Sequence, residues 1–337
     1  MPASPVRPFV KRTEDLIQPP EVGIISLFGG FLGLLPVALQ KRIMEGSTQK
    51  NPYMGFVVDP YAFFLCHEIT DLEGTQRLLP DDFRIVPTAV FEGDEPKPTV
   101  IFGAFNVHTS AFWGNRVEMY VIAEHKPSGL LGWVIVDYDS NTLSFDPGQG
   151  FEGPATSRSV VTTTHRAEVL VDVVTDTRRI AAVADLEKAI SRPLDPRLWV
   201  EGNLCVGYGG TLGDGGDPFG LLFDPGEMEK ALEIPLDAVE LQELTWHPGL
   251  YDPTPHRVAV FPYAQHFITS QVPTQAQVTT PEGLDGFVRR FVEGPAPKGF
   301  SSSAIKTSMF IGWCISTTLT LSMAAWIVVH LMSGHGH

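Results

Sequence analysis

The chain has little cysteine and little positive charge. Its three cysteines, Cys66, Cys205 and Cys314, are odd in number and far apart, which argues against a disulfide framework and against a CxxC metal site. Only 24 lysines and arginines stand against 39 aspartates and glutamates, for a formal net charge of -15. Because an acidic chain repels the phosphate backbone, we expect no nucleic-acid partner.

The chain also lacks the common short motifs of enzymes. It contains no G-x-x-x-x-G-K-[ST] loop for phosphate, no HExxH metal motif and no GxSxG serine elbow. Each of these motifs fixes the spacing that its chemistry needs, so their absence removes the usual ATPase, zinc-protease and hydrolase mechanisms. The residues alone predict no catalytic residue, no metal site and no cofactor bound by the chain itself.

A long uncharged segment is present at residues 307–332. It contains no Asp, Glu, Lys or Arg, and at about 1.5 Å rise per residue it exceeds the roughly 30 Å hydrocarbon core of a bilayer. We expect a transmembrane helix. Basic residues come just before it and none after it, so the positive-inside rule predicts a single-pass protein of the cytoplasmic membrane with its bulk in the cytoplasm. The basic residues are Arg289, Arg290, Lys298 and Lys306.

Two features of this segment suggest contacts within a membrane. Small residues recur at every fourth position and predict a face where a partner helix can approach closely, namely Gly312, Ser316, Thr320 and Ala324. His330 is a candidate cofactor-binding residue, whose imidazole could ligate a chlorophyll or haem in peripheral contact with partner subunits. The alternative for His330 is a histidine at the membrane–water boundary.

The remaining chain divides into four parts by composition. Residues 1–21 are rich in proline and predict an extended N-terminal arm. Residues 22–45 contain an uncharged apolar run at 22–39, interrupted by glycines and a proline, which predicts a membrane-associated or subunit-contact segment. The alternatives are a segment buried under the protein's own domain and a true second span. Residues 51–293 are expected to form the cytoplasmic domain, and residues 294–306 a linker.

The sequence predicts a mainly β (α+β) domain between residues 51 and 293. Its β-branched and aromatic runs are separated by Gly, Pro, Asn and Asp, and some are apolar on both faces, which favours a closed or cone-like antiparallel β-barrel with few short helices. We expect strands at 99–107, 117–123, 132–138, 158–164, 167–174, 204–208 and 257–261. We expect helices near 72–79, near 182–190, after Asp224, and from 281 to about 294.

The order of several elements resembles the acetoacetate decarboxylase-like superfamily. The matching features are Leu78-Leu79-Pro80 at a helix end, the β segment Phe102 to Phe105, the stretch Gly114 to Tyr120, and Gly132-Trp133-Val134. The resemblance covers residues 56–246 and implies a cone-like β-barrel. It also implies that Glu118 corresponds to an active-site glutamate. Arg116 and Glu118 together mark a possible ligand pocket.

The chain departs from that family at the catalytic lysine. The family's reaction uses a lysine amine, with its pKa lowered by its surroundings, to form a Schiff base with a keto acid. The corresponding stretch here is 144–159, and no lysine occurs between Lys126 and Lys188. We therefore expect no decarboxylation by the family mechanism.

Two functions remain. The first is a non-catalytic accessory or structural subunit of a large membrane complex, photosynthetic (reaction centre or light-harvesting) or respiratory, whose partners are membrane subunits and the lipid bilayer. Its layout is similar to that of a reaction-centre H-type subunit, which also joins one span to a β-rich cytoplasmic domain. The alternative is a membrane-tethered decarboxylase-like enzyme or small carboxylate-binding protein. The missing lysine favours the first.

Overall fold

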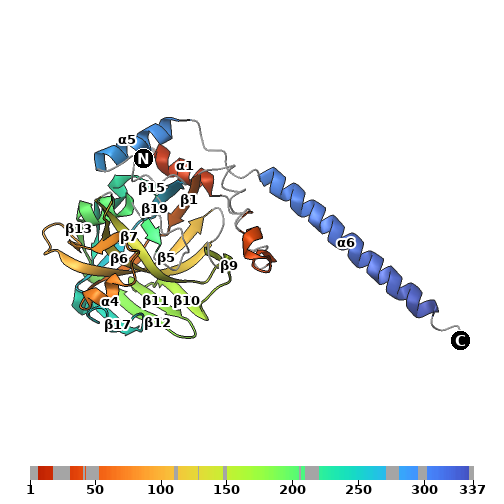
Figure 1. The fold of residues 1–337 in the computed structure, drawn as a ribbon, viewed down its shortest axis with the longest axis horizontal. Helices are drawn as coiled ribbons and strands as arrows, with labels where there is room; N and C mark the ends of the chain where they lie inside the picture. The colour runs from red at the N-terminus through yellow and green to blue at the C-terminus, as the bar shows by residue number, and fades with distance from the viewer. Residues whose placement is uncertain are drawn as a thin grey trace. The chain divides into compact units, whose positions relative to one another are not determined.

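The computed structural model describes residues 7–17, 31–40, 42, 53–109, 113–127, 129–146, 150–204, 206–208, 220–270, 281–294 and 302–333 (Figure 1). The chain divides into two compact units, Met1–Pro297 and Lys298–His337. The first unit is mainly antiparallel β-structure with few helices, and the second contains one long helix. This confirms the predicted fold class.

The main sheet of the first unit curls into a half-barrel. Along its principal path the strand order is β13-β16-β18-β2-β5-β1-β19-β15, and β6 and β7 extend it from β5. The pairs are antiparallel except for β14, which runs parallel to β7. Its strands are β1 (Tyr53–Val58), β2 (Ala62–Glu68), β3 (Phe83–Ile85), β4 (Pro87–Thr88), β5 (Lys97–Thr109), β6 (Trp113–His125), β7 (Leu130–Ser140), β13 (Ile190–Pro193), β14 (Val206–Tyr208), β15 (Gly220–Phe223), β16 (Lys230–Glu233), β18 (Arg257–Phe261) and β19 (Gln265–Ser270).

A second, four-stranded sheet packs on one face of the main sheet. Its strands are β10 (Arg158–Thr163), β11 (Glu168–Val174), β12 (Arg179–Asp185) and β17 (Val239–Leu244), and a short hairpin is formed by β8 (Ser144–Asp146) and β9 (Gly150–Glu152). Side chains of both sheets form one apolar cluster, which includes Met119, Val134, Val171 and Ala182. Alternation along the strands, with a period of two, places these residues inward.

The other face of the main sheet is covered by an aromatic cluster and by short helices. The ring of Phe64 meets those of Trp133, Trp199 and Phe261 edge-on, with centroids 5.5–6.1 Å apart. Both indoles are buried and satisfied, because Trp133 Nε1 donates to Leu198 O and Trp199 Nε1 donates to Val90 O. Trp199 lies on a π-helical turn, η2 (Arg197–Glu201), that packs into this face.

The helices of the first unit are α1 (Pro8–Leu16), α4 (Leu72–Gln76) and α5 (Pro281–Glu293). Short 3-10 turns are η1 (Leu186–Lys188), η3 (Gly202–Leu204), η4 (Pro225–Met228) and η5 (Leu236–Ala238). Helix α1 lies beside α5, and Arg12 Nη2 donates to Gly294 O at 2.8 Å (Figure 1).

The second unit contains α6 (Ser302–Ser333). Within it, Phe310–Ile327 is long and apolar enough to cross a membrane, and none of that stretch is buried within the protein. The helix expected at 307–332 is confirmed and begins five residues earlier. The linker expected at 294–306 lies mostly outside the described residues, as does the part of the apolar segment before residue 31.

Two sequence expectations are corrected. Residues 8–16 form α1 instead of an extended arm, because Pro8 suits the first turn of a helix and the helix buries Phe9 and Thr13 against the body. Residues 182–185 belong to β12 instead of a helix. Pairing with β11 and β17 on both sides outweighs the helix preference of the alanines there.

Candidate functional site

Three polar side chains lie in a row on the aromatic face of β6. Arg116, Glu118 and Tyr120 occupy alternate positions of the strand and therefore point to the same side. Val117 and Met119, between them, face the second sheet. The strand thus presents a polar row within a face that is otherwise apolar and aromatic.

Glu118 is the centre of this row. Its Oε1 accepts from Arg116 Nε at 2.6 Å, and its Oε2 accepts from the hydroxyl of Tyr120. The guanidinium of Arg116 lies over the ring of Tyr138 on β7, 4.7 Å from its centroid. The side chains of Arg116 and Glu118 are 11% and 8% exposed. A buried pair of this kind persists because each charge has a partner, since an unpaired charge at this depth would be costly.

The neighbouring strand β5 carries a glycine, Gly103, directly opposite Glu118. Gly103 on β5 pairs with Glu118, and the next inward position, Phe105, pairs with Arg116. A Cβ at Gly103 would lie 2.9 Å from Phe64 Cε1 and 3.2 Å from Tyr120 Cε2. Only glycine therefore lets the two rings close over the strand beside the carboxylate.

The lysines of these strands lie far from Glu118. Lys126 follows β6 eight positions beyond Glu118, about 26 Å along an extended strand. It donates from Nζ to Asp81 O. Lys97 begins β5, six positions before Gly103, and pairs with Glu68. Neither amine is placed to act beside the carboxylate.

A second charged cluster joins the two sheets. Arg178, in the turn between β11 and β12, donates to both oxygens of Asp139 at 2.7 and 2.8 Å and also to Asp137. Its guanidinium stacks 3.9 Å from the Trp246 ring centroid. Burial raises the pKa of Asp137, but hydrogen bonds from His247 and Arg178 outweigh burial and lower that pKa to about 2. Every charge in this cluster has a partner, so it serves as a structural clamp.

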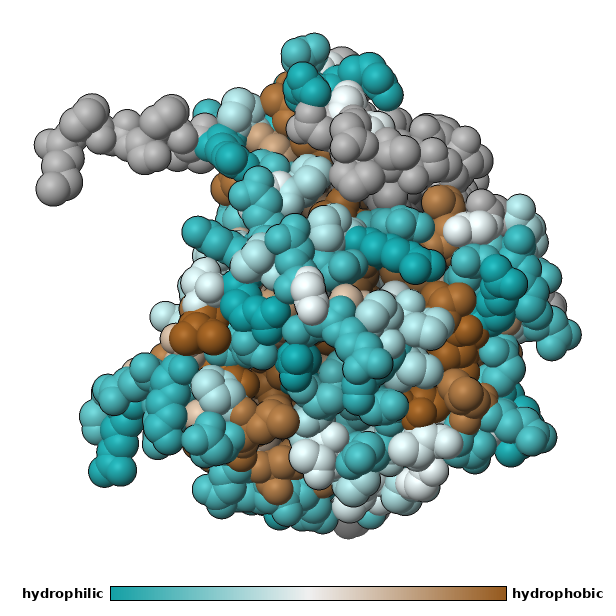
Figure 2. Space-filling model, turned by 90° about the vertical axis from the view of Figure 1, so that its left-hand side faces the viewer, coloured by the Kyte–Doolittle hydropathy of each residue, from teal (hydrophilic) through white to brown (hydrophobic). Residues whose placement is uncertain are grey.

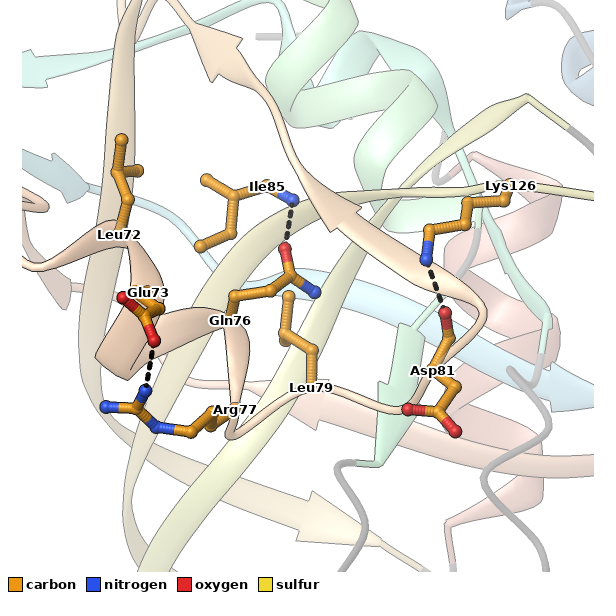
Figure 3. A pocket seen from close by; sticks show the side chains of 8 residues that line it. All are labelled: Leu72, Glu73, Gln76, Arg77, Leu79, Asp81, Ile85 and Lys126. Atoms are coloured by element: carbon orange, nitrogen blue, oxygen red, sulfur yellow. Dashed lines mark hydrogen bonds and ion pairs between the residues drawn. The ribbon is translucent and has the colours of Figure 1, made fainter.

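An open groove of about 730 Å³ lies between α4 and β3 (Figure 3). Its charged groups bind one another: Arg77 pairs with Glu73 at 2.9 Å, and Lys126 donates to Asp81 O. Gln76 Oε1 accepts from the backbone of Ile85 at 3.2 Å. These contacts engage the charged groups of Glu73, Arg77 and Lys126 and the amide of Gln76 within the protein. The groove therefore gives no indication of a ligand-binding site. The groove is lined by Leu72, Glu73, Gln76, Arg77, Leu79, Asp81, Ile85 and Lys126.

The candidate membrane residues all lie on α6. The small side chains of Ser316, Thr320 and Ala324 are exposed, and a Cβ at Gly312 would meet nothing within 4 Å. His330 stacks on Trp326 with centroids 5.1 Å apart. The helix-packing face and the contact of His330 with a pigment or haem both stay predictions.

Sequence reasoning named Arg116 and Glu118, and the structure brings these two side chains together. Sequence reasoning did not single out Tyr120, the third member of the row, or Tyr138 and Gly103, which lie beside the row on β7 and β5. The signal for Tyr120 was present in the sequence, since positions 116, 118 and 120 share one strand face. The signal for Tyr138 and Gly103 was absent, because it depends on which strands pair.

No family model and no curated protein matches this chain. Among solved structures it is similar to an acetoacetate decarboxylase from Legionella pneumophila, with 15% identity, a TM-score of 0.39, and coverage of 64% of this chain and 84% of that one. An acetoacetate decarboxylase-like enzyme from Sphingomonas wittichii has 11% identity and a TM-score of 0.37, with 65% and 91% covered. An enduracididine biosynthesis enzyme has 10% identity and a TM-score of 0.35, with 65% and 86% covered. These neighbours include the family that the sequence resembles, and at this level of identity they show no shared substrate or reaction.

Proposed function

We propose that the protein is a membrane-tethered β-barrel protein that binds a small carboxylate ligand beside Arg116 and Glu118, without Schiff-base chemistry. The observation that carries this proposal is the row of Arg116, Glu118 and Tyr120 on the aromatic face of β6, in which Glu118 and Tyr120 are buried and the Arg116 side chain is 11% exposed. Arg116 holds Glu118 through Nε, and a planar guanidinium with five donors is the group that matches a carboxylate ligand in geometry and charge.

The surroundings favour binding of an organic acid over an inorganic ion. The ring of Tyr120, in the row, and that of Trp133, with their centroids 5.0 Å apart, provide apolar contact area. Pockets for small molecules combine such surfaces with a few convergent polar groups. Glu118 adds selectivity, because it repels a ligand with a second negative charge on that side.

The proposal excludes a Schiff base because no lysine occurs between Lys126 and Lys188, and Lys97 and Lys126 lie far along their strands from Glu118. A carbonyl group on the ligand would therefore not be attacked by an amine. The ligand is bound and released unchanged, or is altered only by proton transfer at Glu118 or Tyr120.

The test is calorimetric titration of the full chain, in a mild detergent, with acetate, pyruvate and acetoacetate. We expect binding of at least one of these by the wild type and at least a roughly tenfold weaker Kd for Arg116→Met. Arg77→Met is the matched control, because Arg77 also pairs with a glutamate but is exposed at the C-terminal cap of α4. Borohydride added with acetoacetate should trap no adduct. Equal binding by Arg116→Met and wild type, or no binding by either, would overturn the proposal.

The accessory-subunit function is the second candidate, and the exposed side chains of α6 favour it. Trp313, Leu319 and Trp326 are each about two-thirds exposed on a helix that could lie against lipid or another membrane helix. Sedimentation after mild detergent extraction tests this function. Migration with a large pigment- or haem-bearing assembly supports it, and migration of the chain alone contradicts it.

A further inference from the structure

Residues 31–40 present an apolar surface to solvent. Phe31 is 68% exposed, Leu34 80%, Val37 37% and Leu39 44%. Outside α6, the described residues have only three other exposed large apolar side chains, and these lie far apart in the sequence: Leu72, Ile190 and Leu236. Figure 2 shows one face of the molecule as mainly hydrophilic, with apolar groups in small separate patches. Among the side chains whose exposure the structure describes outside α6, large apolar exposure is therefore concentrated in one segment of ten residues.

The segment is folded into helical turns. Leu34 N donates to Phe31 O at 3.1 Å, and Leu39 N donates to Pro36 O at 2.8 Å. These local bonds satisfy backbone groups that an extended apolar loop would leave for water. The segment can therefore enter a less polar medium at a lower cost than an open loop.

A buried glutamine ties the segment to the body. Gln40 is 2% exposed, its Nε2 donates to Leu35 O at 2.7 Å, and its Oε1 accepts from the backbone of Phe151 on β9. Gly150 has a φ of +87°, and a Cβ there would lie 2.8 Å from Gln40 Oε1. The hairpin thus holds Gln40 closely while Phe31 and Leu34 point outward.

The charge pattern around the segment is that of a membrane interface. Residues 31–40 contain no Asp, Glu, Lys or Arg, and the chain continues directly with Lys41 and Arg42. Arg42 is exposed. Apolar side chains followed by basic ones suit the boundary between acyl chains and anionic headgroups.

We propose that residues 31–40 form a second membrane attachment, which inserts Phe31 and Leu34 at the boundary between the headgroups and the acyl chains of the bilayer crossed by α6. This inference rests on the membrane anchor of the proposed function. Once α6 is inserted, the contact is intramolecular, so even a weakly binding segment is held at the surface. The body is then fixed to the bilayer at two points of the chain.

The experiment uses the full chain in liposomes of brominated or unbrominated lipid, because bromine quenches only tryptophans that reach the acyl chains. Leu34→Trp adds a reporter to the segment, and Leu72→Trp adds one to an exposed leucine of α4, 51% exposed. The native Trp313 and Trp326 report insertion of α6. We expect brominated lipid to remove roughly half of the emission added by Leu34→Trp and none of that added by Leu72→Trp.

The outcomes separate this inference from the anchor itself. If the wild-type protein shows no quenching, α6 is not inserted and the anchor of the proposed function fails. If the wild type is quenched but Leu34→Trp adds no quenched emission, the anchor stands and the second attachment is wrong. If a protein partner or a second copy of the chain covers the segment instead, the added tryptophan is likewise not quenched, and the second attachment is wrong. Equal quenching of both added tryptophans also overturns the inference, because it shows only that the body lies near the bilayer.

Discussion

Arg178 donates through Nε and Nη2 to the two carboxylate oxygens of Asp139, and so joins the turn of the second sheet to β7 of the main sheet. Asp139 is 5% exposed. Asp137 accepts from the same guanidinium and from His247 Nε2 at 2.8 Å. The two sheets are thus joined by a multidentate ion cluster as well as by apolar packing.

Replacing Arg178 should strongly destabilise the body. Arg178→Met leaves the buried Asp139 without its cation and removes one of the two partners of the half-buried Asp137, and we expect a loss of about 3–5 kcal/mol of unfolding free energy. Denaturant unfolding in detergent measures it. Arg77→Met is the control and should cost less than about 0.5 kcal/mol, because the Arg77–Glu73 pair is exposed. Equal effects of the two substitutions would contradict the clamp.

The body should lose stability as the pH falls below the ordinary pKa of histidine. Burial lowers the pKa of His67 to about 4, and its Nε2 is buried without a hydrogen-bond partner. In the unfolded chain His67 has its ordinary pKa of 6.5. Between pH 4 and 6.5 the unfolded chain therefore binds more protons than the folded chain, and the unfolding free energy rises with pH. His256, with a pKa lowered to about 4 by burial, contributes in the same direction.

A substitution at His67 tests this pH dependence. His67→Gln should flatten the curve of unfolding free energy between about pH 4.5 and 6.5 by up to about 1.4 kcal/mol per pH unit. Above about pH 7 the difference from wild type should be constant with pH. Curves that stay parallel throughout would show that folding does not lower the pKa of His67.

Glycine at position 103 should be required by the two rings that flank it. Gly103→Ala places a methyl group 2.9 Å from Phe64 and 3.2 Å from Tyr120, and we expect a cost of about 1–3 kcal/mol. Gly153→Ala is the matched control, with nothing within 4 Å of its Cβ. It should change stability by less than about 0.5 kcal/mol. The prediction is wrong if the two variants unfold alike.

Gln40 should stabilise the local structure of residues 31–40 but not the main sheet. Gln40→Ala removes the acceptor of the Phe151 amide, so hydrogen exchange should speed up at Phe151 and across residues 35–40. Exchange in β5 and β6 should stay at wild-type rates, since local opening does not require global unfolding. Faster exchange throughout the main sheet would show that Gln40 supports the core instead.

The bulk of the chain should face the cytoplasm. Protease added to inside-out vesicles should then degrade the body, and right-side-out vesicles should protect it, as the basic residues before α6 predict. Lysis of right-side-out vesicles with detergent is the control and should restore cleavage. Protection in inside-out vesicles would reverse the orientation.

The sequence predicted the positions of individual strands better than it predicted which strands pair with one another. Residues 257–261 form β18 as expected, because their β-branched and apolar residues match a buried strand. The alanines of β12 misled the prediction near 182–190, since strands on both sides of β12 decide its conformation. Local preference is weak where pairing supplies the energy.

The candidate site shows the same division. Arg116 and Glu118 share a strand face, so their proximity follows from their spacing. The cation–π contact of Arg116 with Tyr138 depends on the register of β6 against β7, which shifts at a bulge between Met119 and Tyr120. The contact of Arg178 with Asp139 joins two sheets. No short-range pattern in the sequence encodes either.

The main sheet pairs strands that lie far apart in the sequence of the body. β1 pairs with β19, from Tyr53 opposite Ser270 to Val58 opposite Gln265, and β2 pairs with β18. Each of these pairings closes a very long loop. The conformational entropy lost on closing the loop must be overcome before the contacts stabilise the chain. During synthesis, β1 and β2 therefore remain without these partners until β18 and β19 have left the ribosome. We expect slow folding of the body, with β1 and β2 exposed to aggregation for most of the synthesis time.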